Sequence, residues 1–335
     1  PTSQPVVPAI STSLTRPPPT LPPTLAAAYE LHPPGVLAEG AFAAVQRLRC
    51  LQTGAWAALK VVEKQPLAIR NMLRQLGREV RIQGALTHPN ILRLLGTFED
   101  ESYVYMLLEY CAGGTLRAMC ARLPALRLPE THAAVYFAQI LRGVDYMHQC
   151  GCVHRDLKPD NVLLTEFNEV RICDFGWSAE VLAERSLLTT CGTPNYWAPE
   201  LFEGLPQTHA IDLWALGNMI YEVLVGHAPF WGSQEEIRQK VLVVDLRYPP
   251  NLLTAEAVHL FHCLLQRDPK ARAPAAWLLA NHPWVLAGVA MLAPAAPAGA
   301  ASPQASACAA AAAMGAPLEC AAALAASAPD AAPTA

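Results

Sequence analysis

One stretch of eight residues limits what this chain can be more than any other part of the sequence. It reads His-Arg-Asp-Leu-Lys-Pro-Asp-Asn and occupies positions 154–161. The tripeptide Asp174-Phe175-Gly176 begins 13 residues after Asn161. Two aspartates and an amide at this spacing, with a lysine two residues after the first aspartate, suit magnesium-dependent phosphoryl transfer. One aspartate would accept the proton of an attacking hydroxyl, while the asparagine and the other aspartate would hold metal ions against nucleotide phosphates.

Length, charge and cysteine content set looser bounds. The 335 residues suffice for one large or two medium domains. The net charge of −4 gives no indication of a nucleic-acid or membrane surface. Ten cysteines without regular spacing suit reduced thiols in a cytoplasmic or nuclear protein. Cys150, Cys152 and His154 could suggest a zinc site, but no second ligand pair follows them, so we do not expect one.

A second set of motifs precedes the catalytic stretch. Gly40 lies between two strand-like runs, and Lys60 lies in an apolar run that predicts a buried strand. Glu79 follows Lys60 by 19 residues, in a segment with helical character. A carboxylate paired with the lysine would hold the ammonium where nucleotide phosphates need it. Because the pairing depends on the position of the helix, it would also act as a switch.

Together these motifs resemble the eukaryotic protein kinase family, over about residues 29–284. The runs at 78–94 and 174–178 are similar to those of Aurora kinases, whereas residues 191–196 look more like those of Polo-like kinases. The resemblance implies an α+β, bilobal protein kinase fold, with a small antiparallel-sheet lobe and a mainly helical large lobe. It implies ATP and Mg²⁺ as cofactors. Lys158, two residues after Asp156, fits the serine/threonine class.

The composition changes at both ends of the resemblance. The start is rich in proline, threonine and serine, which cannot bury a core, and the end is rich in alanine without an amphipathic stripe. The first residue is a proline, which suggests an excerpt of a longer protein. We expect a disordered Pro-rich leader (1–28), a protein kinase domain (29–286) made of a small lobe (29–110) and a large lobe (111–286), and an Ala/Pro-rich low-complexity tail (287–335).

The resemblance also implies roles for individual residues. Asp156 would be the catalytic base, Lys158 would stabilise the transferring phosphoryl group, and Asn161 would bind Mg²⁺ together with Asp174. Lys60, supported by Glu79, would anchor the nucleotide. The full set expected around ATP is Leu37, Gly40, Val45, Ala58, Lys60, Glu79, Glu109, Cys111, Leu163 and Asp174.

Other residues would support or regulate the site. By the same resemblance, Asp212 would brace the catalytic loop, and Arg272 would form a buried ion pair with Glu200. The regulatory spine would consist of Gln83, Leu94, His154 and Phe175. Thr189 matches the activating phosphosite, with Thr190 as a second candidate, and a phosphate there would be bound by Arg155. The alternative is that neither threonine is phosphorylated.

One feature departs from the family pattern. The glycine-rich loop over the phosphates has alanine at positions 38 and 43, so that only Gly40 is left. Methyl groups at two of three places should hinder the close approach of backbone amides to the phosphates. This departure motivates an alternative function, that of a pseudokinase or scaffold with weak or no turnover. The intact set of Lys60, Glu79, Asp156, Asn161 and Asp174 favours the active enzyme.

The resemblance extends to substrates and partners. It implies protein substrates and an activator peptide on the small lobe, with neither nucleic acid nor membrane as a partner. Asp160 would favour a basic residue shortly before the target Ser or Thr, and an aspartate that is merely solvated is the alternative. Centrosome, spindle or basal body are expected locations by analogy alone, within a cytoplasmic or nuclear protein.

Overall fold

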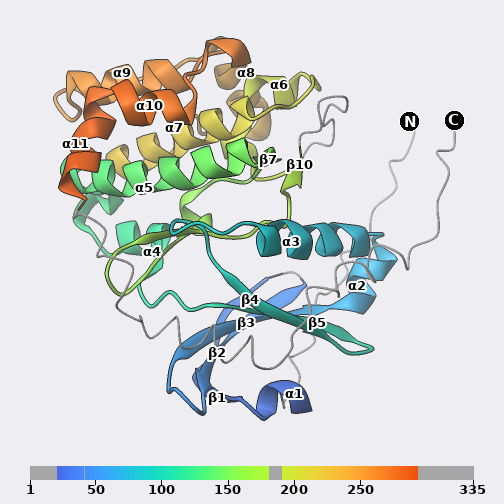
Figure 1. Ribbon diagram of the computed structural model, residues 1–335. Coiled ribbons are helices and arrows are strands. Elements are labelled where there is room, and N and C mark those ends of the chain that lie inside the picture. Colours follow the sequence, from blue (N-terminus) through green and yellow to red (C-terminus); the bar gives the residue numbers. More distant parts are fainter. Residues whose placement is uncertain (1–20, 41, 181–190, 293–335) are drawn as a thin grey trace, which may run out of the picture. The chain divides into compact units, whose positions relative to one another are not determined.

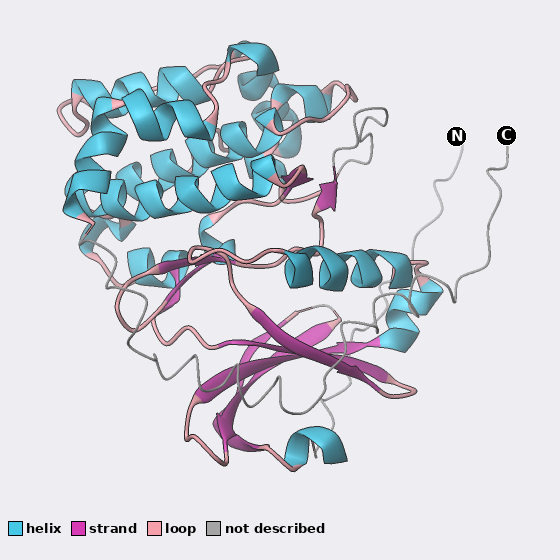
Figure 2. Ribbon diagram, in the orientation of Figure 1, coloured by secondary structure: helices cyan, strands magenta, loops and turns pink. Residues whose placement is uncertain are grey.

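The computed structural model describes residues 21–40, 42–180 and 191–292. Its residues divide into two compact units. The described part of the first, here called the sheet unit, runs up to Leu73 and includes Leu95–Glu109. The second, the helical unit, comprises Arg74–Leu94 and the described residues from Tyr110 onward. Figure 2 shows strands dominating one unit and helices the other, which confirms the predicted α+β class.

The sheet unit contains one five-stranded sheet in the order β1-β2-β3-β5-β4. Strands β1, β2, β3 and β5 pair antiparallel with their neighbours. Leu59 and Leu107 lie opposite each other in the middle of the sheet, and both are buried in the core of this unit. The elements are α1 (Pro23–Ala26), β1 (Tyr29–Glu39), β2 (Ala43–Cys50), β3 (Trp56–Glu63), α2 (Lys64–Ile69), β4 (Leu94–Glu99) and β5 (Tyr103–Glu109).

The structure corrects the predicted leader at residues 21–28. Pro22 and Pro23 begin the short helix α1, since proline has the backbone angle that a first helical turn needs. Leu25 is completely buried in the core of the sheet unit, with Leu48 and Tyr29 in the same cluster. The Pro-rich composition concealed the apolar contacts of Leu25 and Ala28, which join the segment to the core of the sheet unit.

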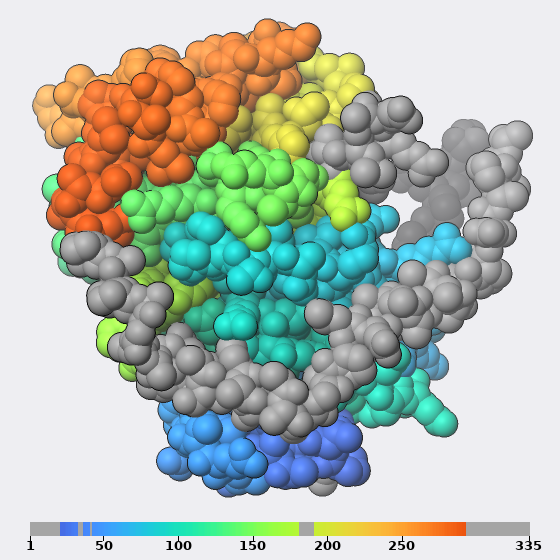
Figure 3. Space-filling view, in the orientation of Figure 1, coloured from blue at the N-terminus to red at the C-terminus, as the bar shows by residue number. Residues whose placement is uncertain are grey.

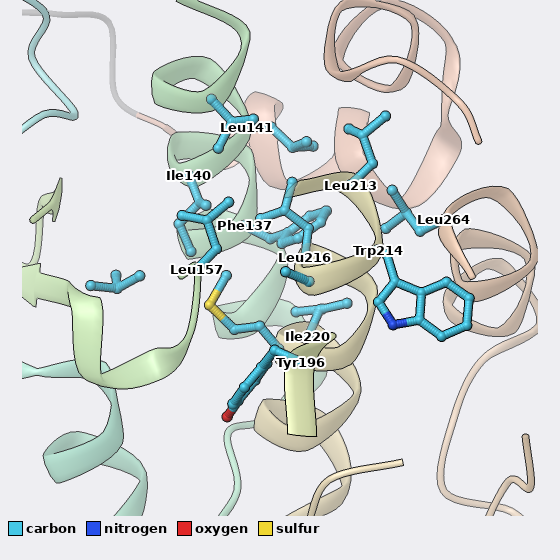
Figure 4. Close-up of a cluster of buried hydrophobic side chains, with 14 of the residues drawn as sticks. Phe137, Ile140, Leu141, Leu157, Tyr196, Leu213, Trp214, Leu216, Ile220 and Leu264 are labelled. Carbon is cyan, nitrogen blue, oxygen red and sulfur yellow. The ribbon is translucent and has the colours of Figure 1, made fainter. Parts of the chain in front are cut away.

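The helical unit is built on two long buried helices, α5 (Glu130–Gln149) and α7 (Ala210–Val225). Figure 4 shows Phe137 of α5 beside Leu216 of α7, and Ile140 and Ile220 belong to the same core cluster. The other helices are α3 (Leu73–Ala85), α4 (Leu116–Ala121), α6 (Pro199–Phe202), α8 (Gln234–Val243), α9 (Ala255–Leu264), α10 (Ala275–Asn281) and α11 (Pro283–Met291), together with the short 3-10 turns η1 (Pro124–Leu126), η2 (Pro159–Asn161), η3 (Pro194–Tyr196) and η4 (Pro269–Ala271).

The predicted boundary between the lobes, at residue 110, also differs from the structure. Residues 74–94, which include α3, group with the helical unit. The reason lies in side-chain contacts within that unit: Gln75 donates to the carbonyl of Gly176 at 2.6 Å, and Arg81 forms a bidentate ion pair with Glu180. The prediction divided the chain at a single sequence position, whereas these contacts connect α3 to segments about 100 residues later in the sequence.

The helical unit extends beyond the predicted end at residue 286. Helix α11 continues to Met291, and its Gly288 lies so close to α5 that an added Cβ would be 2.2 Å from the carbonyl oxygen of Ala134. In the space-filling view the orange residues of the last helices lie beside the green residues of α5 (Figure 3). Because glycine has no side chain, α11 can pack closely against α5. The prediction missed this contact because the sequence after residue 286 has no amphipathic pattern. Among the described residues, no helix combines the length and the apolar character that crossing a bilayer requires.

Two small sheets of the helical unit hold the segments that carry the motifs (Figure 1). One has the order β6-β8-β9 and the other pairs β10 with β7. Their bounds are β6 (Gly114–Thr115), β7 (Cys152–Val153), β8 (Val162–Leu164), β9 (Val170–Ile172) and β10 (Ala179–Glu180). The catalytic stretch therefore connects β7 to β8, and Asp174 follows β9 after one intervening residue, Cys173.

Candidate active site

Asp212, at the start of α7, fixes the backbone of the catalytic stretch. Its carboxylate is fully buried and accepts hydrogen bonds from the backbone amides of His154 and Arg155, each at 2.9 Å. The His148 ring nitrogen Nε2 lies 3.0 Å from the same carboxylate. Burial alone would raise the pKa of Asp212, but the hydrogen bonds from His148 and the His154 amide hold that pKa below its ordinary value. Asp212 thus stays charged and holds the loop, as its predicted bracing role requires.

The Asp156 side chain is the most densely bonded group of the catalytic stretch. One carboxylate oxygen accepts from Lys158 Nζ at 2.7 Å and from Asn161 Nδ2 at 3.0 Å. The other accepts from the backbone amide of Thr193 at 3.0 Å and from its hydroxyl at 2.9 Å. Four donors from three residues leave little rotational freedom to a side chain that is only 5% exposed. The structure therefore brings together three of the residues predicted for catalysis.

Asn161 and Asp174 are brought close by a β-hairpin. Val162 of β8 pairs with Ile172 of β9, and the amide of Cys173 donates to the carbonyl of Asn161 at 3.0 Å. Asp174 is the next residue, with a φ of 65°, in the left-handed region that aspartate tolerates better than most residues. Such strain is frequent at functional sites, where the surrounding structure must enforce it.

The donor atoms at this hairpin fit a magnesium ion. The amide nitrogen of Asn161 donates to the carbonyl of Asp156 at 2.8 Å as well as to its carboxylate, so its side-chain oxygen is the atom that could bind a cation. Together with the Asp174 carboxylate this gives oxygen ligands, which Mg²⁺ prefers. Both residues lie within the helical unit, and Asn161 contacts Asp156.

Thr193 is a site residue that sequence reasoning missed. Its hydroxyl accepts from Lys158 Nζ at 2.8 Å while it donates to Asp156. The preceding Gly192 has a φ of 87°, and a Cβ there would lie 2.6 Å from the Arg155 carbonyl, so only glycine fits. The sequence indicated only that a glycine precedes this threonine. It gave no indication that the threonine hydroxyl bonds to Asp156.

Helix α3 contributes Glu79 and Gln83 to the helical unit. Both are buried, and Gln83 donates to the carbonyl of Leu92 at 3.1 Å, which explains how a polar residue is accommodated there. His154 and Phe175, two other predicted spine residues, pack with ring centroids 5.2 Å apart. Leu94 is half-buried at the start of β4. Lys60 belongs to the sheet unit and Glu79 to the helical unit, so their pairing stays a prediction.

Three of the nucleotide-binding residues predicted in the sheet unit share one face of the sheet. Ala58 and Lys60 are two residues apart on β3, and Val45 of β2 lies opposite Lys60. Side chains alternate along a strand, so these three share the face opposite Leu59, which is buried in the core. Leu108, which pairs with Ala58, lies on the same face.

The described residues of the predicted phosphate-covering loop belong to the β1-β2 hairpin, whose pairing has a register shift between Val36 and Ala38. Ala38 pairs with Val45, and the Gly40 amide donates to the Ala43 carbonyl at 2.7 Å. Gly40 does not have a left-handed backbone, and a Cβ there would meet its nearest neighbour at 3.6 Å, an ordinary contact. The hairpin itself therefore does not require glycine. Leu37 is 42% exposed at the end of β1.

Three further residues predicted near the nucleotide are divided between the units, with Glu109 in the sheet unit and Cys111 and Leu163 in the helical unit. Glu109 is the buried last residue of β5, opposite Ala57. Cys111 and Leu163 are half-buried, and Leu163 pairs with Thr115 in the small sheet β6-β8-β9. The structure positions each of these residues within its own unit, and their contact with ATP stays a prediction.

The ion pair predicted between Glu200 and Arg272 is present. Two parallel hydrogen bonds join the guanidinium to the carboxylate, at 2.6 and 2.7 Å, and both side chains are buried. Arg272 also donates to the carbonyls of Ala210 and Gln266. The pair thus links α6, α7 and the segment after α9, away from the catalytic groups.

The predicted phosphosites Thr189 and Thr190 lie outside the described residues. Arg155, the residue expected to bind the phosphate, has a φ of 69° and donates from Nε to the Trp177 carbonyl at 2.6 Å. Burial lowers the pKa of its guanidinium, because the charged form is desolvated. A doubly charged phosphate nearby would offset that cost, as the predicted role requires.

Comparison with known proteins agrees with this geometry. Residues 32–285 match the family model for the protein kinase domain. The chain is 39% identical to Aurora kinase A-A of Xenopus laevis over 251 residues, which cover 75% of this chain and 60% of the frog protein. It is 37% identical to Aurora-1, a serine/threonine-protein kinase of Arabidopsis thaliana, over 252 residues that cover 84% of the plant protein. The Aurora kinase of Saccharomyces cerevisiae is 38% identical over 253 residues.

These matches confirm the predicted family, and the Polo-like features at 191–196 stay a prediction. The chain spans less than two thirds of the length of the frog relative. The matched region contains the catalytic stretch, the hairpin with Asp174 and the phosphate-covering hairpin. The chain belongs to the protein kinase family and is, within that family, an Aurora-like serine/threonine kinase.

Proposed function

We propose that this protein transfers the γ-phosphate of ATP to serine and threonine hydroxyls of other proteins, in a reaction that depends on Mg²⁺. One observation carries the proposal: the Asp156 carboxylate is held by Lys158, Asn161 and Thr193, beside the hairpin that supplies Asp174. A carboxylate so oriented suits a base for an incoming hydroxyl. The family membership supports the same reaction.

The residues divide the work between them. Asp156 orients the substrate hydroxyl and takes its proton, and Lys158 places a positive charge beside the reacting oxygen. Asn161 and Asp174 would bind the metal ions through oxygen atoms, and Mg²⁺, when bound, offsets the charge of the phosphates. Lys60, paired with Glu79, would bind the nucleotide, while Leu37, Gly40, Val45, Ala58, Glu109, Cys111 and Leu163 would surround it.

We further propose activation by phosphorylation at Thr189, with Thr190 as the second candidate and Arg155 as the phosphate ligand. The expected partners are protein substrates and an activator peptide that binds the sheet unit. A cytoplasmic or nuclear location, at the centrosome, spindle or basal body, is proposed from the resemblance to Aurora kinases. The kinase domain would extend from about residue 21 to residue 292, because the described core includes Leu25 and α11.

Transfer of labelled phosphate from ATP to a generic basic protein tests the reaction. The protein is phosphorylated at Thr189 and assayed with Mg²⁺, and phosphoamino-acid analysis identifies the product. We expect phosphoserine and phosphothreonine, with a decrease of about 10²–10⁴-fold in Asp156→Asn, the range typical for loss of a general base. If the phosphorylated wild type transfers nothing, the alternative of a pseudokinase or scaffold is correct.

A further inference from the structure

Arg117, on helix α4, lies at the centre of a cluster of charged and polar side chains beside the catalytic stretch. Its Nε donates to Asp160 at 3.0 Å, and its Nη1 forms a short hydrogen bond to Glu222. Its Nη2 donates to the Tyr196 hydroxyl at 2.8 Å, and that hydroxyl donates in turn to Glu222. We call these four residues the Arg117 cluster. All three guanidinium nitrogens are bonded, which fixes the side chain.

The cluster joins four separate segments of the helical unit: α4, η2, η3 and α7. Its two carboxylates and one guanidinium leave a net charge of −1. The Glu222 side chain is only 15% exposed, whereas that of Asp160 is 47% exposed. Burial and the contact with Glu222 raise the pKa of the Tyr196 hydroxyl, so it stays protonated and donates. Without Arg117, two carboxylates would face this surface with no cation from the cluster between them.

Two members of the cluster, Asp160 and Tyr196, are close in sequence to residues that contact Asp156. Asp160 is the residue between Pro159 and Asn161, and Asn161 contacts the Asp156 carboxylate. Tyr196 follows Thr193, whose hydroxyl also contacts Asp156, by one turn of chain. An extended peptide advances about 3.3 Å per residue, so a residue a few positions from the acceptor hydroxyl reaches this surface. A pair of carboxylates there would select a basic residue, since Arg forms bidentate pairs with them.

We propose that Arg117 takes, from within the chain, the place that a basic residue of a substrate would otherwise occupy. The inference rests on the proposed function and names its substrate class: Ser/Thr sites without a requirement for a preceding basic residue. It replaces the expectation that Asp160 alone favours such a residue. Arg117 is a positioning residue for peptide selection and does not contact the reacting atoms.

Intramolecular competition supports the proposal. Thr115 caps α4 by accepting from the Ala118 amide, and Leu116 and Cys120 anchor the helix in the core. Arg117 is therefore held next to its acidic partners, at an effective concentration of about millimolar or more. A peptide at micromolar concentration cannot displace it through one arginine. The Arg117 guanidinium already pairs with these carboxylates in the folded protein, so an arginine of the substrate adds no binding free energy there.

The test compares two peptides that differ only in carrying Arg or Ala at the positions two and three before the acceptor serine. Wild type should use both with kcat/KM values within about threefold of each other. Arg117→Met, which keeps the apolar stem and removes the charge, should prefer the Arg peptide by about tenfold or more, the effect of one well-placed ion pair. Asp160→Asn added to Arg117→Met should reduce this gained preference.

Further variants separate the outcomes. Arg267→Met removes another ion-paired arginine, bonded to Glu203 at 2.8 Å, and should leave the ratio of the two peptides as in wild type. If Arg117→Met does not fold, Arg117→Lys provides the test. The lysine keeps one positive charge but cannot pair with both carboxylates, so the ratio of the two peptides should be intermediate. A wild type that prefers the Arg peptide tenfold, or an Arg117 variant with an unchanged ratio, overturns the inference. If wild type phosphorylates neither peptide, the proposed function fails, and the ratio of peptide dissociation constants in the same variants still decides the inference.

Discussion

The catalytic stretch and the phosphate-covering hairpin would serve the same reaction, but they are held in very different ways. In the stretch, side chains from distant segments fix the functional groups: Asp212 holds the backbone, and Thr193 holds Asp156. In the hairpin at residues 38–45, the fixed contacts are those of backbone pairing between β1 and β2. The first arrangement can be broken by removing one distant side chain, whereas the second should respond mainly to its own residues.

This difference predicts where the protein is sensitive to change. Buried polar groups are costly when they lose a partner, because the remaining group has neither water nor a bond. The helical unit contains many such groups, among them Asp212, Glu200 and Arg272. We therefore expect large effects on stability and turnover from the helical unit, and small effects on nucleotide affinity from the hairpin.

The largest effect should come from Arg272→Ala. It leaves the Glu200 carboxylate buried without its guanidinium partner, and we expect a loss of about 3–5 kcal/mol in the free energy of unfolding. Urea denaturation followed by circular dichroism measures it. Arg267→Ala breaks the exposed pair with Glu203 and should cost less than about 1 kcal/mol. Equal losses in the two variants would mean that burial of the ion pair does not matter.

Acid should weaken the helical unit through His282. Burial, and the positive charge that the neighbouring His259 can carry, lower the pKa of His282 to about 4 from an ordinary value of 6.5. A histidine whose pKa is lowered in the folded state makes its full contribution to the free energy of unfolding above pH 6.5. That contribution is lost as the pH falls toward 4. The loss should reach about 3 kcal/mol, since one pKa unit corresponds to about 1.4 kcal/mol.

Urea denaturation at pH 7 and at pH 4.5 measures this effect. His282→Asn should unfold with a smaller difference between the two pH values, even if it is less stable throughout. His227→Gln, which changes an exposed histidine, should keep the difference of the wild type. A difference that persists unchanged in His282→Asn would assign the acid sensitivity to other groups.

Thr193→Val tests the contact between Thr193 and the proposed base, Asp156. The variant keeps the size of the side chain but removes the hydroxyl that bonds Asp156 and Lys158. Hydrogen bonds to charged groups contribute about 1.5–3 kcal/mol, so kcat should fall by about 10- to 100-fold with little change in the KM for ATP. Thr193→Ser retains the hydroxyl and should restore most of the rate. If valine and serine behave alike, the hydroxyl does not orient Asp156.

The smallest effect is expected in the hairpin. Replacing Ala38 and Ala43 together by glycine should lower the KM for ATP by less than about tenfold, because backbone amides could then approach the phosphates more closely. Steady-state kinetics at varied ATP concentration measure it. Ala276→Gly, on the exposed side of α10, controls for general effects of added glycine. Unchanged KM and kcat in the double variant would show that the two alanines are neutral.

The sequence predicted what local motifs encode. The family was predicted from motifs at fixed spacing, and the resemblance to that family implied the α+β class and the ion pair between Glu200 and Arg272. The comparisons confirm the family, and the structure shows the ion pair. Thr193 and His148 were missed because they meet Asp156 and Asp212 across 37 and 64 residues of chain, and neither neighbour carries a motif that indicates this. Two segment ends differ from the prediction for a related reason. Leu25 packs into the core of the sheet unit, Gly288 packs against α5, and neither contact is indicated by a motif.

The Arg117 cluster illustrates the same limit. Asp160 suggested selection of basic substrates because its neighbours in sequence are catalytic. Its partner Arg117 lies 43 residues earlier, on a helix that the motifs do not describe. If the proposal is correct, that contact removes the expected preference for a basic residue.

The central claim is that Asn161 and Asp174 complete, with Asp156, a magnesium-dependent phosphotransfer site. Its most direct test is phosphate transfer from ATP to a protein substrate by wild type and by Asp174→Ala, each phosphorylated at Thr189. Asp245→Ala, which alters an aspartate paired with the exposed Arg247, is the control. We expect transfer by wild type and by the control, and a decrease to below about 1% in Asp174→Ala, because a metal ligand is lost. Transfer that survives in Asp174→Ala at the rate of the wild type would contradict the account.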